Sequence, residues 1–139
     1  MTKIVRAVSD GVVAHATAPL GKIYYLLFEL ADGDIRADFE FTATKTMVWR
    51  NKCLHEIAVA LDQLHRRSIY HQDVKPSNIL VFGKGKETKL ADLGRAHYAG
   101  KDSPHDFRKI AGAYSYAALE LLYDAPLADR RSERASADL

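Results

Sequence analysis

The sequence has few features that point to export, to metal binding by sulfur or to a membrane. Cys53 is the only cysteine among 139 residues, so the chain can form neither an internal disulfide nor a zinc site built from its own thiolates. No stretch reaches the roughly 18 apolar residues of a membrane span, and residues 1–10 lack the apolar run of a secretory signal. These absences predict a cytoplasmic protein without a membrane span.

The sequence also lacks a large excess of either positive or negative charge. Lys and Arg total 20 and Asp and Glu total 18, which gives a net charge of only +2. A nucleic-acid interface would need basic residues gathered on one face. The three arginines near the end, Arg130, Arg131 and Arg134, are instead interleaved with acidic residues. We therefore predict a solvated face there and no nucleic-acid partner.

The first third of the chain is predicted to form a small antiparallel sheet. Residues 4–8 and 12–13 have the apolar and β-branched character of short strands, and Asp10-Gly11 between them suggests a turn. Residues 23–28 combine aromatic and aliphatic side chains, which predicts a largely buried strand. Residues 31–34 break that strand with a turn or linker.

A helix, a hairpin and a second helix are predicted further on. Residues 47–67 carry apolar side chains at spacings of three and four, as an amphipathic helix does. The predicted core-facing stripe consists of Leu54, Ile57, Ala58, Leu61 and Leu64. Residues 79–91 read as a β-hairpin with a Gly-Lys-Gly turn at 83–85. A short helix with a loop is expected around residues 38–46, and another helix at 117–123.

The residues with chemical potential follow the long predicted helix. The run His71-Gln72-Asp73-Val74-Lys75-Pro76-Ser77-Asn78 precedes the hairpin, and Asp92-Leu93-Gly94 follows it. Phosphoryl transfer needs a carboxylate to orient the accepting hydroxyl, oxygen ligands to hold Mg²⁺ against the phosphates, and a nearby cation. Because a hairpin brings its two ends together, we expect Asn78 to lie near Asp92.

Residues 71–78 resemble the protein-kinase catalytic loop, H-R-D-x-K-P-x-x-N, and residues 92–94 resemble the D-F-G element. This resemblance implies that Asp73 is the catalytic base and that Lys75 contacts the transferred phosphate. It further implies that Asn78 and Asp92 bind Mg²⁺. His71 is expected to be a packed, hydrogen-bonded side chain rather than an acid or base.

The resemblance extends to the flanking segments. Phe28-Glu29-Leu30-Ala31 resembles the kinase hinge, which implies that backbone groups of Glu29 and Ala31 bind adenine. Asp34 would contact the ribose and Leu80 would line the floor of the adenine pocket. Residues 118–120 resemble A-P-E, and Asp138 is expected to open the helix that anchors the catalytic loop from beneath.

The implied fold is an α+β protein-kinase domain, truncated at both ends. Residues 1–28 would be small-lobe strands, 29–35 the hinge and 36–139 the first half of the helical large lobe. The implied activity is that of a serine/threonine protein kinase of the bacterial type, which uses ATP and Mg²⁺ to phosphorylate a protein substrate. Lys75 favours Ser/Thr over tyrosine, since tyrosine kinases usually lack a lysine there.

Several positions depart from the family pattern. No G-x-G-x-x-G and no V-A-I-K-like strand lysine occur in the sequence, Gln72 replaces the usual arginine, and Ala113 stands where a threonine is common. We therefore expect weak or no activity from the isolated chain. Two alternatives stay open: a catalytically inactive kinase-like remnant that acts as a binding module, and a small-molecule phosphotransferase of the aminoglycoside or choline type.

Overall fold

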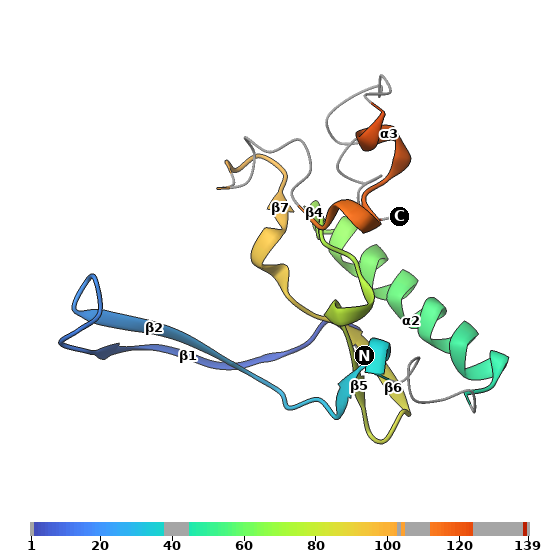
Figure 1. Cartoon of the computed structure of the whole chain (residues 1–139), viewed down its shortest axis with the longest axis horizontal. Helices are drawn as coiled ribbons and strands as arrows, with labels where there is room; N and C mark the ends of the chain where they lie inside the picture. Colours follow the sequence, from blue (N-terminus) through green and yellow to red (C-terminus); the bar gives the residue numbers. More distant parts are fainter. Residues whose placement is uncertain (1, 38–44, 103, 105–111, 124–137, 139) are drawn as a thin grey trace.

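An antiparallel β-ribbon projects from a packed body in the computed structural model, which describes residues 2–37, 45–102, 104, 112–123 and 138 (Figure 1). Strands β1 (Ala7–Ala14) and β2 (Lys22–Phe28) form the ribbon. The predicted antiparallel strands are confirmed, but the turn expected at Asp10-Gly11 is wrong. Those two residues pair with Leu26 and Tyr25 in the middle of the ribbon, and the chain reverses only across residues 15–21.

Gly11 continues the strand because the Tyr25 ring lies across it. A Cβ atom built on Gly11 would come within 2.5 Å of the Tyr25 hydroxyl oxygen and 2.6 Å of the adjoining ring carbon. A residue with a side chain at position 11 would therefore require the exposed Tyr25 ring to move, so this glycine marks a close cross-strand approach and not a turn. Sequence reasoning took the more common meaning of Asp-Gly and missed the pairing.

The prediction that residues 23–28 are largely buried is also wrong. Every residue of β2 is exposed, and Leu26 and Phe28 keep 62% and 54% of their surface accessible. A run of aromatic and β-branched residues favours an extended strand, but burial requires a second layer of structure against it. The ribbon pairs its two strands with each other and leaves both faces of β2 open to solvent.

The packed body consists of one long helix against a three-stranded sheet. Helix α2 (Met47–His65) lies along β6 (Glu87–Leu90), which pairs with β5 (Ile79–Phe82), and β5 pairs with β3 (Gly33–Asp34). This confirms the predicted helix and hairpin. The buried apolar core lies between helix and sheet and comprises Ile35, Ile57, Ala60, Leu61, Leu64, Ile79, Val81 and Leu90.

Two members of the predicted helix stripe face solvent instead. Leu54 is 71% exposed and Ala58 is exposed, whereas Cys53 and Glu56 are buried. The buried face includes Glu56 because its carboxylate accepts hydrogen bonds from both the backbone amide and the hydroxyl of Thr88 on β6, each 2.8 Å long. A polar partner in the sheet therefore sets the rotation of the helix, and apolar periodicity alone could not reveal it.

Glu56 also joins the N-terminal segment to the body. The Lys3 ammonium lies 2.9 Å from Glu56 and 2.7 Å from Glu87, and Lys52 lies 2.8 Å from Glu56. Burial opposes ionisation of Glu56, but the hydrogen bonds from Lys52, Lys3 and Thr88 outweigh it and lower its pKa to about 2. The Lys3 backbone carbonyl accepts from the Leu90 amide at 2.8 Å, so residues 3–5 run beside β6.

Short elements complete the described structure. Strand β4 (Ile69–Tyr70) pairs with β7 (His97–Tyr98), and single 3-10 turns occur at η1 (Pro76–Asn78), η2 (Leu93–Arg95) and η3 (Tyr114–Tyr116). The helix expected at 117–123 is present as the four-residue α3 (Leu119–Leu122). Residues 35–37 are helical, while 38–44 and the arginines at 130–134 lie outside the described residues. Within the part of the chain described, no helix is long and apolar enough to cross a membrane.

Candidate active site

The loop that carries Asp73 runs from β4 to η1 and is held from both sides. His71 is fully buried, and its Nε2 lies 2.9 Å from the backbone carbonyl oxygen of Ala91 at the end of the hairpin. Gln72 takes a left-handed conformation with φ of 62°, which turns the chain toward Asp73. The expectation of a packed, hydrogen-bonded His71 is confirmed, and its contact ties the loop to β6.

Asp138 holds the same loop by its backbone. Its side chain is fully buried, and its two carboxylate oxygens accept from the amides of His71 at 2.8 Å and Gln72 at 2.5 Å. His65, the last residue of α2, places its Nε2 2.8 Å from the same carboxylate. Asp138 thus anchors the loop and joins it to the end of α2. The helix that Asp138 was expected to open would lie outside the described residues.

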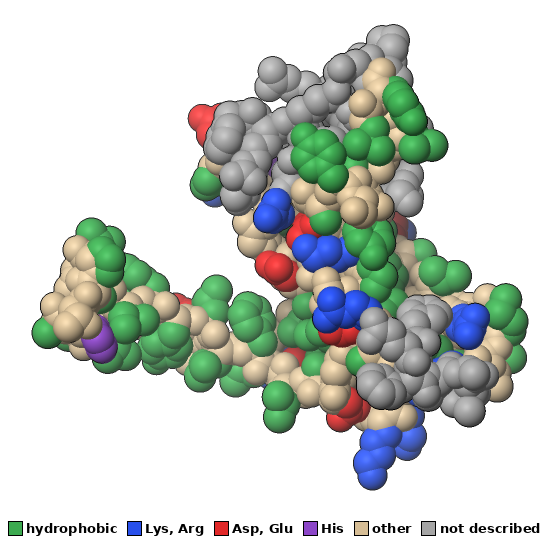
Figure 2. Space-filling model, in the orientation of Figure 1, with side chains coloured by type: hydrophobic (Ala, Val, Ile, Leu, Met, Phe, Trp, Pro, Cys, Tyr) green, Lys and Arg blue, Asp and Glu red, His purple; other side chains and the backbone are tan. Residues whose placement is uncertain are grey.

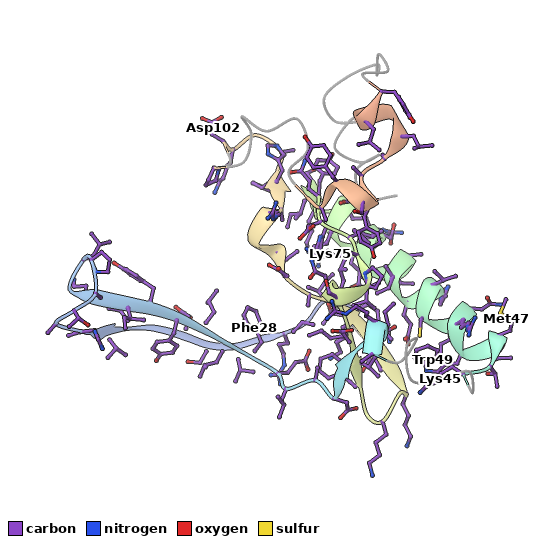
Figure 3. All side chains as sticks on the ribbon, in the orientation of Figure 1. Phe28, Lys45, Met47, Trp49, Lys75 and Asp102 are labelled. Carbon is purple, nitrogen blue, oxygen red and sulfur yellow. The ribbon has the colours of Figure 1, made fainter. Side chains whose placement is uncertain are left out.

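The Asp73 carboxylate lies at the centre of a cluster of donors. Its Oδ2 atom is 2.6 Å from the Lys75 ammonium, 3.2 Å from the Asn78 side-chain nitrogen and 3.9 Å from Arg95 Nε. Its Oδ1 atom accepts from the Ala113 amide at 3.0 Å. The Asp73 side chain is only 3% exposed. The structure therefore brings together the predicted residues Asp73, Lys75 and Asn78, with Lys75 labelled in Figure 3.

Glycine is required at position 112 by the approach of this segment to the loop. A Cβ atom on Gly112 would lie 2.1 Å from the carbonyl oxygen of Gln72 and 3.1 Å from Oδ1 of Asp73. Such distances leave no room for a side chain. The absence of a side chain at Gly112 lets the amide of Ala113 reach the Asp73 carboxylate. At position 113 the contact is made by the backbone, since alanine has no hydroxyl group.

Asp92 stands one residue beyond the strand pairing that joins the hairpin ends. Ile79 pairs with Leu90, and the Ala91 amide donates to the Asn78 carbonyl at 2.8 Å, so the backbones of Asn78 and Ala91 are adjacent. Asp92 is exposed and left-handed, with φ of 63°, and one of its oxygens accepts from the Gly94 amide at 3.2 Å. The backbone of Asn78 thus lies beside Ala91, the residue before Asp92, and the approach of the Asn78 and Asp92 side chains stays a prediction.

The oxygen atoms offered by Asn78 and Asp92 suit a hard cation. The Asn78 amide nitrogen is occupied by the carbonyl and carboxylate oxygens of Asp73, which leaves its side-chain oxygen as the atom for a ligand. The described residues contain no group of three His, Cys, Asp or Glu side chains that could enclose a metal. Mg²⁺ fits such a sparse set because it keeps several waters and is bound through one or two carboxylates together with phosphates.

The residues predicted for the adenosine side lie where the ribbon joins the body. Leu80 is half-buried and pairs with Asp34, while its neighbours Ile79 and Val81 point into the core on the other side of β5. The Asp34 carboxylate accepts from the amides of Arg36 at 2.8 Å and Ala37 at 3.2 Å. Asp34 therefore caps the helical turn at 35–37, and this structural role is separate from the ribose contact predicted for it.

The two hinge residues differ in how they are held. The Glu29 amide donates to the Arg6 carbonyl at 3.1 Å, so this amide is already paired within the chain. The Glu29 carboxylate takes hydrogen bonds from Lys89 at 2.8 Å and from the Arg6 amide at 2.9 Å. The Lys89 bond and then the Arg6 bond hold its pKa below the usual value. Ala31, next to the 94% exposed Leu30, is half-buried.

Sequence reasoning missed Arg95, the second cation beside Asp73. It directly follows Asp92-Leu93-Gly94, and the η2 turn aims it back at the catalytic loop. The available signal was a basic residue three positions after a proposed metal-binding aspartate. Figure 2 shows acidic and basic side chains next to one another in the middle of the view, between the apolar ribbon and the upper part of the molecule.

Comparison with known proteins establishes the family of the chain. The family model described as protein kinase domain matches residues 6–137, so the chain belongs to the protein kinase family. Zebrafish serine/threonine-protein kinase SBK1 is 41% identical over 71 residues, which is 50% of this chain and 17% of the relative. The Drosophila protein named death-associated protein kinase related is 36% identical over 105 residues, 73% of this chain and 15% of the relative.

Protein kinase kin1 of fission yeast is 33% identical over 104 residues, 74% of this chain and 11% of the relative. The chain thus spans less than a fifth of the length of each of these three relatives. They come from animals and a yeast, so the expectation of a bacterial-type kinase gains no support from them. Membership of the family establishes a transferase domain, of a kind that in general uses ATP and Mg²⁺.

Proposed function

We propose that this site belongs to a serine/threonine protein kinase, with Asp73 as the base that accepts the proton of the substrate hydroxyl. The observation that carries the proposal is the convergence of Lys75, Asn78 and the Ala113 amide on one buried carboxylate. These groups fix the orientation of Asp73, as a base requires if it is to meet a hydroxyl in one geometry. Lys75 lies where a cation could neutralise charge on the transferred phosphoryl group.

ATP is the proposed phosphate donor and Mg²⁺ its proposed companion. Asn78 and Asp92 would hold the ion, which when bound neutralises phosphate charge. Leu80 would contact adenine, and the carbonyl of Glu29 and the amide of Ala31 would form hydrogen bonds with the adenine ring. Asp34 would contact the ribose. We assign residues 1–28 to the small lobe, 29–35 to the hinge and 36–139 to the large lobe.

A protein hydroxyl is the proposed acceptor. All three relatives cited above have names that contain protein kinase, and one of them, SBK1, is named a serine/threonine-protein kinase. These names favour a protein over a small molecule as the acceptor. Lys75, two residues after Asp73, supports Ser/Thr rather than tyrosine as the acceptor. On the same sequence grounds as before, we propose a cytoplasmic location and no nucleic-acid partner.

Activity of this chain by itself is proposed to be weak, because the sequence holds no glycine-rich phosphate loop. A second role, as a binding module without catalysis, is favoured by the apolar ribbon, whose β2 strand is exposed along its whole length. Exposed apolar surface of this kind often marks an interaction site. The two roles differ in whether the site binds Mg²⁺ and ATP.

Thermal unfolding with and without nucleotide tests the proposal. A ligand that binds only the folded state raises the free energy of unfolding by RT ln(1 + [L]/Kd), and the melting temperature rises with it. We expect millimolar ATP with Mg²⁺ to stabilise the wild-type chain, and Asp92→Asn to lose the Mg²⁺-dependent part of that shift. Asp62→Asn on the exposed face of α2 is the matched control and should retain it. Absence of any wild-type shift would favour the binding module.

A further inference from the structure

We propose that Lys89 is a positioning residue of the adenine site, which holds residues 29–31 of the hinge against the strand that carries Leu80. The inference deepens the proposed function and rests on it, because it concerns how the hinge comes to face a nucleotide. It assigns a role to a lysine of β6. Its basis is the ion pair that Lys89 forms with Glu29.

Lys89 lies on the same face of the sheet as Leu80 and Asp34. Leu80 of β5 pairs with Lys89 of β6 on one side and with Asp34 of β3 on the other. Directly paired residues of antiparallel strands point to the same face of a sheet, so these three side chains form one row. The neighbouring residues of β5, Ile79 and Val81, are buried in the core on the opposite face. The row therefore lies on the face where we propose the adenine and ribose contacts.

Three contacts hold the Lys89 ammonium on this face. Its Nζ lies 2.8 and 3.0 Å from the two carboxylate oxygens of Glu29. It lies 4.8 Å from the centroid of the Phe82 ring and 4.0 Å from a carboxylate oxygen of Glu87. The Lys89 side chain is only 11% exposed. An enclosed lysine that is held from several sides keeps one geometry, unlike the exposed pairs of a protein surface.

Glu29 passes this restraint to the backbone of the hinge. Its amide donates to the Arg6 carbonyl at 3.1 Å, and its carboxylate accepts from the Arg6 amide at 2.9 Å. Arg6 directly precedes β1 and Glu29 directly follows β2, so their contacts close the base of the ribbon. Lys89 thus ties the base of the ribbon to the β5–β6 hairpin through the Glu29 side chain.

The hinge is attached to the hairpin a second time at Asp32. The Asp32 amide donates to the Val81 carbonyl at 2.8 Å, and the Asp32 carboxylate accepts from the Lys84 amide at 2.6 Å. Between the two attachments, Leu30 is 94% exposed, so its side chain contributes little packing. The short segment is therefore positioned by its two ends, and the attachment at Glu29 depends on a lysine side chain that a substitution can remove.

Calorimetric titration of the full chain with adenosine, ATP and inorganic triphosphate, each with Mg²⁺, tests the role. The variants are Lys89→Met, which removes the ion pair, and Lys89→Arg, whose guanidinium can also bind a carboxylate through two nitrogens. One well-oriented hydrogen bond corresponds to about tenfold in affinity. We expect Lys89→Met to weaken adenosine and ATP about equally, by about tenfold, and to leave inorganic triphosphate unchanged. Lys89→Arg should recover most of the loss.

Lys3→Met is the matched control. Lys3 is similarly enclosed, with 18% of its side chain exposed, and it pairs with Glu56 at 2.9 Å and with Glu87 at 2.7 Å. Its loss also breaks ion pairs of the body, but none that involves the hinge. We expect Lys3→Met to lower the urea midpoint and to leave the affinity for adenosine unchanged.

Hydrogen exchange without nucleotide measures the hinge directly. In Lys89→Met we expect faster exchange of the Arg6 and Glu29 amides, whereas the Asp32 amide should keep its protection because its partner lies on β5. If Lys89→Met does not fold, Glu29→Gln takes its place in the titrations. That variant removes the charge of the pair, keeps an oxygen that can accept from the Arg6 amide, and should give the same ligand pattern.

The other outcomes overturn the inference in distinguishable ways. Equal adenosine affinity in the wild type and Lys89→Met would contradict it and leave the proposed function intact. Equal weakening of adenosine and inorganic triphosphate, or a loss of adenosine affinity of the same size in Lys3→Met, would show that a general loss of structure is the cause. If the wild-type chain binds neither adenosine nor ATP, the proposed function fails and this inference fails with it.

Discussion

The ribbon and the body use the same kind of strand with opposite results. Leu26 in β2 and Leu90 in β6 each sit in an antiparallel pair rich in apolar residues, yet Leu26 is 62% exposed and Leu90 is fully buried. The difference is the second layer, since α2 covers β6 and the β1–β2 ribbon is paired only with itself. Strand pairing sets the local shape, and packing against a helix supplies the stability.

The proposed catalytic residues follow the same division between ribbon and body. The network around Asp73 belongs to the body, where the hairpin, the catalytic loop and residue 138 hold one another. The ribbon joins the body at both of its ends, through residues 3–5 beside β6 and through residues 29–31. Changes in the body are therefore expected to affect both stability and nucleotide binding, whereas changes in the ribbon should affect mainly association with other surfaces.

The largest expected effect is that of Glu56→Ala. Removing this carboxylate leaves Lys3 and Lys52 without their shared acceptor and the buried Thr88 amide without its partner. Loss of one member of a buried charge cluster typically costs about 3–5 kcal/mol. Urea denaturation should show a fall of that size in the free energy of unfolding.

Asp62→Ala is the matched control for Glu56→Ala on the same helix. Asp62 pairs with Arg66 four residues on, and both side chains are more than half exposed. Surface pairs of this kind contribute less than about 1 kcal/mol. A change of similar size for Glu56→Ala and Asp62→Ala would mean that the buried cluster does not join the body.

A pair of leucine truncations tests the comparison directly. Leu90→Ala should lower the free energy of unfolding by about 2–5 kcal/mol, the range for a buried leucine. Leu26→Ala in the ribbon should change it by less than about 0.5 kcal/mol, because the side chain is exposed. Guanidinium denaturation followed by circular dichroism gives both values, and similar losses in the two variants would show that the ribbon is covered in solution.

Acid should weaken the body through Glu56. Its pKa is about 2 in the folded chain against an ordinary value of 4.5, so its contribution is complete above pH 4.5 and is lost as the pH falls toward 2. That contribution amounts to about 3 kcal/mol. Urea midpoints measured between pH 6 and pH 3 should fall less steeply for Glu56→Gln than for the wild type. Some pH dependence should remain in the variant, because the pKa of Glu29 is also lowered.

The smallest expected effect concerns the two matched glycines. Gly112→Ala forces a Cβ atom onto the Gln72 carbonyl, whereas Gly33→Ala meets nothing within 4 Å. We expect a loss of about 1–3 kcal/mol for the first and almost none for the second. Hydrogen exchange of the Ala113 amide, which donates to Asp73, should quicken only in Gly112→Ala; equal rates would contradict the close approach.

The fold could be predicted from sequence where the signal was local. The 3.6-residue spacing of Ile57, Leu61 and Leu64 placed α2, and the Gly-Lys-Gly turn placed the hairpin. The burial of Glu56 and the exposure of Leu26 could not be predicted, because each depends on what another element presents. The turn predicted at Asp10-Gly11 was wrong for the same reason, because Gly11 pairs with Tyr25 of the other strand.

The site divides in the same way. The resemblance of residues 71–78 to the protein-kinase catalytic loop assigned Asp73, Lys75 and Asn78 to one site, and the structure brings them together. Arg95 and the Ala113 amide arrive from later segments, so their contact with Asp73 depends on the path of the chain after the hairpin. The roles assigned to Asn78, Asp92 and the hinge residues stay predictions until a nucleotide is bound.

Trp49 provides a built-in optical probe of only one of these two regions. It is the single tryptophan of the chain, and its indole nitrogen donates to the Gly85 carbonyl at 2.9 Å, at the turn of the β5–β6 hairpin. The Lys45 ammonium lies 4.7 Å from the centroid of the ring. Figure 3 labels both residues beside α2. Its emission should therefore report the separation of helix and hairpin and stay blind to movements of the ribbon, whose aromatic side chains include Tyr24 and Tyr25 but no indole.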